Sequence, residues 1–402
     1  MSGNTIELLD LVARWVHVIA GIMWVGNSLL FNWLDRSLVH ADAPGQTKKP
    51  IGSIWLLHSG GFYYVEKTLL DGEEMPVPLH WFKWQAYTTW LTGFALLFIV
   101  YYAGGRASMV DNPVGGLTQL NASIVGLAAI LGGWILYEAM QRVVAPKAPT
   151  VAALVWIVAF VGIAIELTRV LSGRAAFLHV GAMLATIMAG NVFWTIVPSQ
   201  RLLVASAAGD KGGDPVISAR AKRVSIHNNY FTFPVIVLMV SNHFPSLYGH
   251  RLSWLLLIVL VMAGVAVRHV LNVRWSLPRW KPVLAGVITA SVLSLWAIMR
   301  FGVLPEASAS AVPTGPIAFA DVRHIIDRRC SVCHSERPTD PGFPVAPGGV
   351  MFDTPEQIVA HAARIRERAF VTRTMPFGNK TRITDAERAI LGGWAAQQAG
   401  SR

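Results

Sequence analysis

Long apolar runs recur along most of the chain, separated by short polar connections. Each run holds about 20 residues, the length that an α-helix needs to cross the hydrocarbon core of a bilayer. The pattern therefore predicts about eight membrane-spanning helices, over residues 11–31, 84–103, 120–140, 151–171, 175–197, 229–244, 252–270 and 282–304. The first run lacks a preceding basic segment and a small-residue cleavage site, so we expect a retained helix and not a cleaved signal.

The apolar pattern ends after residue 304. Small residues and prolines over 305–316 have the composition of a semi-rigid linker. Residues 317–402 then form a small soluble domain, with helices expected at 319–329 and after a capping box from Thr384 to Glu387. We therefore expect an all-α protein, with a membrane helix bundle over 1–304, a linker, and a carboxy-terminal domain. In the polar connection after the first run, residues 58–67 predict an ordered loop or a short hairpin.

Composition favours a polytopic membrane protein in contact with a lipid bilayer. Charged residues make up only 14% of the chain and hydrophobic residues 53%, whereas a soluble chain carries about 25% charge. The net charge of +11 does not indicate nucleic acid as a partner, because Lys and Arg lie mostly in the connections between apolar runs.

Loop charges also predict an orientation. The connections after runs one, three, five and seven are rich in positive charge: Arg36, Lys48, Lys49, Lys67 and Lys83; Arg142 and Lys147; Arg201, Lys211, Arg220, Lys222 and Arg223; Arg274, Arg279 and Lys281. The alternate connections offer little beyond Arg106, Arg174 and Arg251. The positive-inside rule therefore places both termini outside the cytoplasm.

The only two cysteines of the chain lie in the segment Cys330-Ser-Val-Cys333-His334. In a C-x-x-C-H segment, the two thiols can form thioethers to the vinyl groups of a haem while the imidazole ligates the iron. A redox dithiol or half of a zinc site are the alternatives, but no second cysteine pair and no thioredoxin-like pattern accompany the segment. The motif therefore predicts a covalently bound haem c, whose apolar ring would complete the small core of this domain.

The sixth ligand of that iron has two candidates. Met375 precedes Pro376 in a turn able to hold a thioether, and it lies far enough beyond His334 for the chain to wrap a macrocycle. Met351 follows the motif too closely. Met375 is the expected ligand, and the alternative is a core methionine. Histidine–methionine ligation raises the reduction potential, which suits an electron acceptor.

Ionisable residues within the predicted spans are candidates for function, because charge is costly inside a bilayer. Five of them fall in the outer half, on the side of the predicted haem: His17, Glu166, Arg169, His179 and His243. Three interpretations remain open. The first is a structural ion pair between Glu166 and Arg169 with hydrogen-bonded histidines. The second is a pocket in which Arg169 attracts an anionic substrate while Glu166 or a histidine accepts a proton. The third is a haem b held by two of the histidines. A second group, Glu138, His227, Arg268 and His269, falls near the inner surface.

Several segments together resemble the bacterial membrane-bound, cytochrome c-fused urate oxidases, also called urate hydroxylases. The resemblance covers essentially the whole chain and rests on residues 15–27, 227–234, 241–244, 330–343 and 375–381. It implies oxidation of urate to 5-hydroxyisourate in purine degradation, with electrons leaving through haem c to a respiratory acceptor and not directly to oxygen. It also implies that Cys330, Cys333, His334 and Met375 attach and ligate the haem, in a class I-like cytochrome c domain on the periplasmic side of the inner membrane. No urate-binding residue follows from it.

Two other classes of function compete with a urate-oxidising enzyme. A non-catalytic membrane cytochrome would pass electrons from a partner dehydrogenase. A transporter with a cytochrome sensor domain is disfavoured, because the sequence shows no convincing internal repeat.

Overall fold

A computed structural model of the chain describes residues 3–39, 49–69, 76, 78–103, 109–110, 117–207, 215–301, 313, 315–340, 343, 345–376 and 379–400. Its membrane part contains α1 (Gly3–Ser37), α2 (Lys83–Leu97), α3 (Gln119–Ala139), α4 (Pro149–Val170), α5 (Gly173–Asn191), α6 (Val197–Ala207), α7 (Pro215–Ser241), α8 (Pro245–Tyr248), α9 (Ser253–Val273) and α10 (Trp280–Phe301). Single π-helical turns extend three of them: η1 (Phe98–Tyr102) follows α2, η3 (Met140–Val144) follows α3, and η4 (Val192–Ile196) joins α5 to α6.

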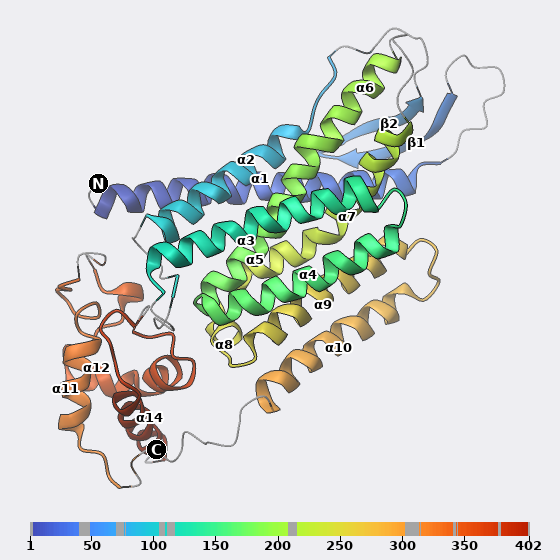
Figure 1. Ribbon diagram of the computed structural model, residues 1–402. Coiled ribbons are helices and arrows are strands. Elements are labelled where there is room, and N and C mark those ends of the chain that lie inside the picture. The colour runs from blue at the N-terminus through green and yellow to red at the C-terminus, as the bar shows by residue number, and fades with distance from the viewer. Residues whose placement is uncertain are drawn as a thin grey trace.

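The long helices lie side by side as a bundle (Figure 1), which confirms the predicted all-α membrane architecture. Seven helices in the described part of the chain are long and apolar enough to cross a membrane. The expected second span is also helical, over α2 and η1, but it is not among these seven. Its early turns carry Gln85 and several threonines, and this lowers its apolar character.

The sixth expected span differs most from its prediction. Its helix, α7, begins at Pro215 instead of near residue 229. The amino-terminal half of α7 carries Arg220, Lys222, Arg223 and His227 and therefore does not read as an apolar run. As a result, His227 lies near the middle of a long helix and not at its end.

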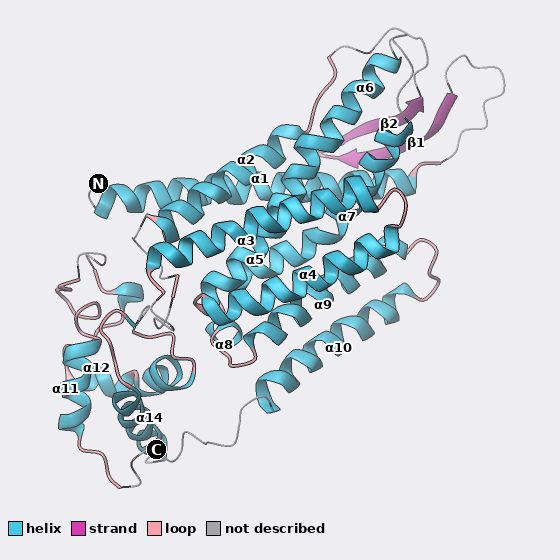
Figure 2. Cartoon of the chain, in the orientation of Figure 1, coloured by secondary structure: helices cyan, strands magenta, loops and turns pink. Residues whose placement is uncertain are grey.

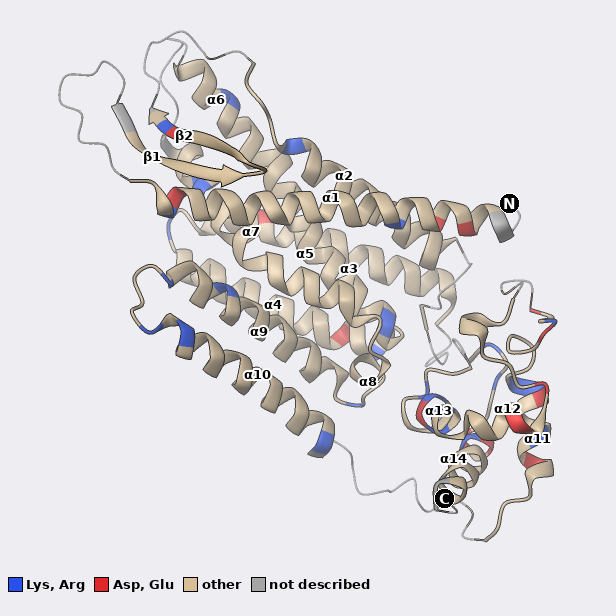
Figure 3. Cartoon of the chain, turned by 180° about the vertical axis from the view of Figure 1, so that it is seen from behind, with Lys and Arg blue, Asp and Glu red and all other residues tan. Residues whose placement is uncertain are grey.

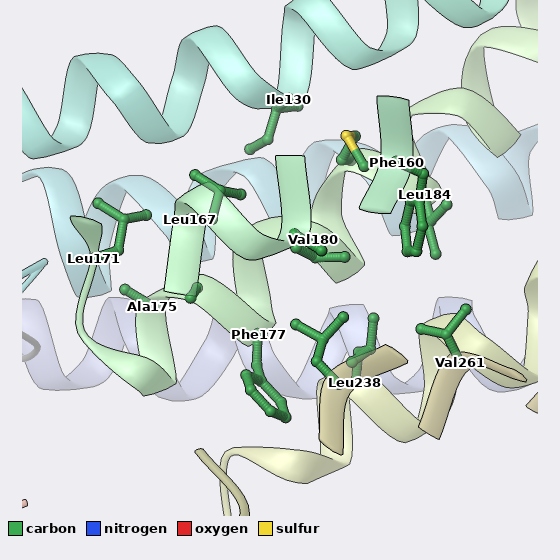
Figure 4. Close-up of a cluster of buried hydrophobic side chains, with 14 of the residues drawn as sticks. Ile130, Phe160, Leu167, Leu171, Ala175, Phe177, Val180, Leu184, Leu238 and Val261 are labelled. Carbon is green, nitrogen blue, oxygen red and sulfur yellow. The ribbon is translucent and has the colours of Figure 1, made fainter. Parts of the chain in front are cut away.

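Helix α5 is the centre of the bundle. Its alanine, glycine and methionine residues allow close approach, and α3, α4 and α7 pack around it. Phe177, Val180 and Leu184 of α5 meet Phe160 of α4 and Leu238 of α7 in the main apolar core (Figure 4). By contrast, the most apolar stretch of α10 has no buried residue. An apolar surface of this kind is what a lipid-facing helix presents.

A β-hairpin projects from the end of the bundle where α1 ends (Figure 1). Strands β1 (Lys49–His58) and β2 (Gly61–Leu69) pair antiparallel, and His58 lies opposite Gly61. Ser59 and Gly60 both have positive φ, as a two-residue hairpin turn requires. The hairpin expected around residues 58–67 is thus present and begins earlier than expected.

The carboxy-terminal domain is a separate helical unit (Figure 2). It contains α11 (Phe319–Arg329), η6 (Pro347–Gly349), α12 (Pro355–Ala360), α13 (Ala362–Ile365), η7 (Arg366–Val371) and α14 (Asp385–Gly400). Its own core gathers Val322, Ile326, Ile358, Leu391 and Trp394. The expected capping box is formed, because the Thr384 amide donates to Glu387 and the Glu387 amide to Thr384 Oγ1. Most of the expected linker, 305–316, lies outside the described residues.

The carboxy-terminal domain lies at the end of the bundle where α1 begins, opposite the hairpin (Figure 1). Lys and Arg gather at the hairpin end, around α6, the hairpin and the turn from α9 to α10 (Figure 3). Of the loop charges used to predict orientation, Lys48, Arg106 and Lys211 lie outside the described residues.

Candidate functional site

The C-x-x-C-H segment forms a tight turn at the carboxyl end of α11. The amide of Cys330 donates to Ile326 O at 2.8 Å, and the amide of His334 donates to Cys330 O at 2.9 Å. Both thiols are free, and both cysteines are partly buried. The turn therefore presents the two sulfurs and the imidazole from one short stretch of backbone.

A cavity of about 380 Å³ lies against this turn. Cys330, Cys333, His334 and Met375 all line it. Apolar side chains supply much of the remaining wall: Phe343, Val350, Phe352, Ile365 and Ala369. Met351 does not line the cavity, although both its neighbours do. The structure thus brings together the four residues expected to attach and ligate a haem.

The imidazole of His334 is oriented by the backbone. Its Nδ1–H donates to Val350 O at 2.9 Å, so Nε2 keeps the lone pair that could bind a metal. Burial lowers the pKa of His334, which favours the neutral imidazole. The ring also packs 5.3 Å from that of Phe352. This arrangement fits an axial haem ligand.

The two alternatives for the cysteines fit less well. Burial raises the pKa of Cys330 to about 12, whereas the attacking thiol of a redox dithiol has a lowered pKa. A zinc site would need further ligands, and the described residues contain no group of three or more His, Cys, Asp or Glu that could hold a metal ion. The donor set and the apolar cavity therefore fit a covalently bound haem better than either alternative.

The charged lining of the cavity is entirely positive among the residues that the structure describes. Its basic members are Arg174, Arg329, Arg364, Arg368 and Lys380, and no carboxylate joins them. Arg329 is paired with Glu387 at 2.9 Å, and Lys380 with Asp340 at 2.6 Å. A ligand that bears carboxylates, as haem does, suits such a lining.

Arg388 of α14 connects the cavity wall to the Met375 segment. Its side chain is 3% exposed, and its guanidinium donates to Ala369 O and, at 2.6 Å, to Met375 O. Sequence reasoning missed this role, because the acceptors are backbone carbonyls and leave no mark in the amino-acid pattern.

The histidines expected in the outer half lie in different environments. His17 of α1 donates from Nδ1 to Thr89 O of α2 at 2.9 Å. His179 of α5 is fully buried, donates from Nδ1 to Ala175 O, and accepts at Nε2 from the hydroxyl of Tyr102, 2.8 Å away. Gly126 of α3 leaves room for this ring, since a Cβ there would lie 2.6 Å from His179 Cδ2.

The other outer candidates lie on the surface of the bundle. His243, just after α7, is exposed. Glu166 and Arg169 form an ion pair of 3.0 Å on α4, with side chains 64% and 68% exposed. The contacts of these three residues do not bring them together with His17 or His179. Glu166 and Arg169 thus form the ion pair that the first of the three interpretations expects. Both residues remain candidates for a substrate pocket.

A buried polar network links α3, α5 and α7 in the middle of the bundle. Asn191 Nδ2 donates to Tyr137 Oη at 3.1 Å and to Asn228 Oδ1 at 2.8 Å. The Tyr137 hydroxyl in turn donates to His227 Nδ1 at 2.8 Å. Asn191 Oδ1 is buried and finds no hydrogen-bond partner among the residues that the structure describes. Buried polar groups of this kind are costly in a membrane, so the network is a candidate binding region.

The next residues of α7 face a second network, on α9. Arg268 is 2% exposed and donates from Nε to Asn229 Oδ1 at 3.0 Å, while Asn272 donates to the same oxygen at 2.6 Å. Within the described part of the chain, Arg268 Nη2 is buried without a hydrogen-bond partner. The guanidinium of Arg268 lies over the Phe233 ring, 5.4 Å from its centroid. The sequential polar residues at 227–229 could have signalled both networks, because successive helix positions point to different neighbours.

Comparison with known proteins gives one match. A family model described as "Urate oxidase N-terminal" matches residues 3–299, from the start of α1 into the last turn of α10. The matched region does not include the carboxy-terminal domain. No curated protein and no solved structure matches the chain.

Proposed function

The chain belongs to this urate oxidase family, and from that premise we propose that it oxidises urate to 5-hydroxyisourate at a membrane and passes the electrons to a haem c. The reaction adds the oxygen of one water to urate and releases two electrons and two protons. A respiratory carrier then accepts the electrons, so that oxygen is not reduced directly. We further propose that the protein lies in the bacterial inner membrane, with the carboxy-terminal domain outside the cytoplasm.

The cavity at the C-x-x-C-H turn is the observation that carries the electron-transfer part of this proposal. Cys330 and Cys333 would attach the haem, and His334 and Met375 would ligate its iron. When bound, the haem supplies a one-electron acceptor of raised potential, so that each urate requires two transfers. The backbone hydrogen bond at Val350 holds the His334 ring, and Arg388 holds the Met375 carbonyl.

The membrane part would supply the substrate site. Urate is planar and largely anionic, so it needs hydrogen-bond donors, a cation and aromatic faces in a region shielded from water. The network around Arg268 and Asn229 offers a buried guanidinium with an unpartnered nitrogen beside Phe233. Arg169, in the last turn of α4, offers a second cation.

A spectroscopic assay on the purified, haem-loaded full chain tests the function. Adding urate without oxygen is expected to reduce the haem and to form 5-hydroxyisourate in a two-to-one ratio of haem to product. An unchanged haem spectrum and no loss of urate would refute the proposal. Haem reduction that occurs only when a partner dehydrogenase and its substrate are added would identify a non-catalytic electron-transfer subunit instead.

Variants separate the parts of the proposal. Cys330→Ala with Cys333→Ala should abolish covalent haem attachment, and Met375→Ala should lower the reduction potential and slow urate-dependent reduction. Comparison of Arg169→Ala with Arg268→Ala then identifies which of the two cations urate requires. An alkaline pyridine assay that counts haem b against haem c tests the proposal of a second haem between histidines of the membrane part, because more than one haem per chain would support it.

A further inference from the structure

One residue of the membrane part reaches the cavity of the carboxy-terminal domain. Arg174, in the first turn of α5, lines the cavity together with Cys330, Cys333 and His334. Every other lining residue among those described lies at position 329 or beyond. Arg174 is therefore the point where the two parts of the chain share one binding surface.

The position of Arg174 is fixed by close backbone contacts. Ser172 caps α5, with its Oγ accepting from the Ala175 amide, and the Ser172 amide donates to Met109 O at 2.7 Å. Gly173 abuts the short helix α8, since a Cβ on Gly173 would lie 1.9 Å from Tyr248 O. The start of α5 is thus held firmly against α8, which leaves little freedom for the backbone of Arg174.

The same short helix touches the carboxy-terminal domain. A Cβ on Gly249, the residue after α8, would lie 3.0 Å from both the Cβ and the carbonyl oxygen of Thr372. Thr372 directly follows η7, whose residues Arg368 and Ala369 line the cavity. A continuous line of contacts therefore runs from Gly173 through α8 to the cavity wall and places Arg174 at the cavity edge.

The charge of Arg174 has no protein partner in the described contacts. Its Nε is buried without a hydrogen bond, and the first turn of α5 contains no acidic residue. A cation at this end of a helix also faces the positive end of the helix dipole. Since the described lining of the cavity contains no carboxylate either, an anionic group of the ligand would offset this charge.

We propose that Arg174 binds a carboxylate of the haem held by Cys330 and Cys333, and thereby joins the membrane part to the haem and raises its reduction potential. This inference rests on the proposed function only in requiring that haem c is bound. A guanidinium can donate two parallel hydrogen bonds to a carboxylate, and a nearby cation stabilises the electron that the haem gains. Arg174 is a positioning residue for electron transfer and takes no part in the chemistry of urate.

A redox titration of the haem-loaded full chain, without urate, tests the role of Arg174. Arg174→Gln is expected to shift the reduction equilibrium about tenfold toward the oxidised haem, which is about 59 mV for a one-electron couple. Arg174→Lys keeps the charge and should recover most of that shift. It also preserves the test if the Gln variant does not accumulate.

Arg300→Gln is the matched control. Arg300 lies in the last turn of α10, at the same end of the bundle, but does not line the cavity. The Arg300→Gln substitution removes the same charge as Arg174→Gln. It should leave the reduction equilibrium of the haem within about twofold of the wild-type value. Equal potentials for Arg174→Gln and wild type, or equal shifts for Arg174→Gln and Arg300→Gln, would overturn the inference.

The titration also keeps this inference separate from the proposed enzyme activity. A wild-type chain that binds haem, fails to oxidise urate, and still shows the Arg174-specific shift would refute the activity and support the inference. A chain that oxidises urate but shows no Arg174-specific shift would support the activity and overturn the inference about Arg174. A wild-type chain without haem would overturn both.

Discussion

Arg388 offers the sharpest test of how the carboxy-terminal domain holds Met375, the proposed sixth ligand of the haem iron. The guanidinium is buried and donates to the carbonyls of Ala369 and Met375. In Arg388→Met, an apolar side chain of similar length removes both hydrogen bonds and leaves two carbonyl oxygens without this donor. The Met375 segment then loses a contact that fixes its distance from the cavity.

The size of the effect follows from the type of bond. A hydrogen bond from a charged donor contributes about 1.5–3 kcal/mol. If only the bond to Met375 orients the thioether, its loss corresponds to about 2 kcal/mol. This is about thirtyfold in the equilibrium between bound and released Met375. The haem-loaded variant should therefore contain a measurable fraction of chains in which Met375 is not a ligand.

Absorption and redox measurements on the haem-loaded protein detect that fraction. The weak long-wavelength band of ferric, thioether-ligated haem should decrease, and the reduction potential should fall, because the methionine ligand raises it. Arg337→Met removes an exposed arginine of the same domain and should change neither property. An Arg388→Met protein with a wild-type band and potential would refute the proposed role of Arg388.

Three further predictions concern other contacts. Gly173→Ala should destabilise the bundle by about 1–3 kcal/mol, because the added Cβ would overlap Tyr248 O. Thermal aggregation in detergent measures the loss of stability, and an aggregation midpoint equal to that of wild type would contradict the prediction. Burial alone would raise the pKa of Glu387, but a backbone amide and Arg329 outweigh it and hold the pKa below its usual value. Glu387→Gln should therefore destabilise the domain above about pH 4.3, by on the order of 1 kcal/mol. The stability difference between the two proteins should vanish as the pH falls through the lowered pKa of Glu387. Haem absorbance during unfolding measures this difference at each pH. A difference that does not change with pH would contradict the proposed role of the Glu387 charge. Tyr137→Phe should lower the stability of the bundle by about 0.6–1.7 kcal/mol. The control is a Tyr→Phe variant at an exposed tyrosine of the hairpin. Equal melting temperatures of the two variants would count against a stabilising role of the network.

The sequence alone predicted most of the membrane helices and the turn that brings Cys330, Cys333 and His334 together. An apolar run of about 20 residues specifies a membrane helix through its own length and composition. Likewise, Cys330 to His334 lie within one turn of backbone, so haem attachment is predicted from their spacing alone and stays a prediction. Helix α7 shows the limit of this approach, because its first half is polar and yet helical, and its start at Pro215 was not predicted.

Only the tertiary structure decided which distant residues act together. Tyr102 and His179 form a hydrogen bond across 77 positions of the sequence, and Arg388 holds backbone atoms that carry no sequence signal. In the sequence, Arg174 is one of a few positive residues in a charge-poor connection, and the fold places it at the cavity lined by Cys330, Cys333 and His334. Periodicity and motif spacing report contacts made along one element, whereas these contacts depend on how separate elements pack.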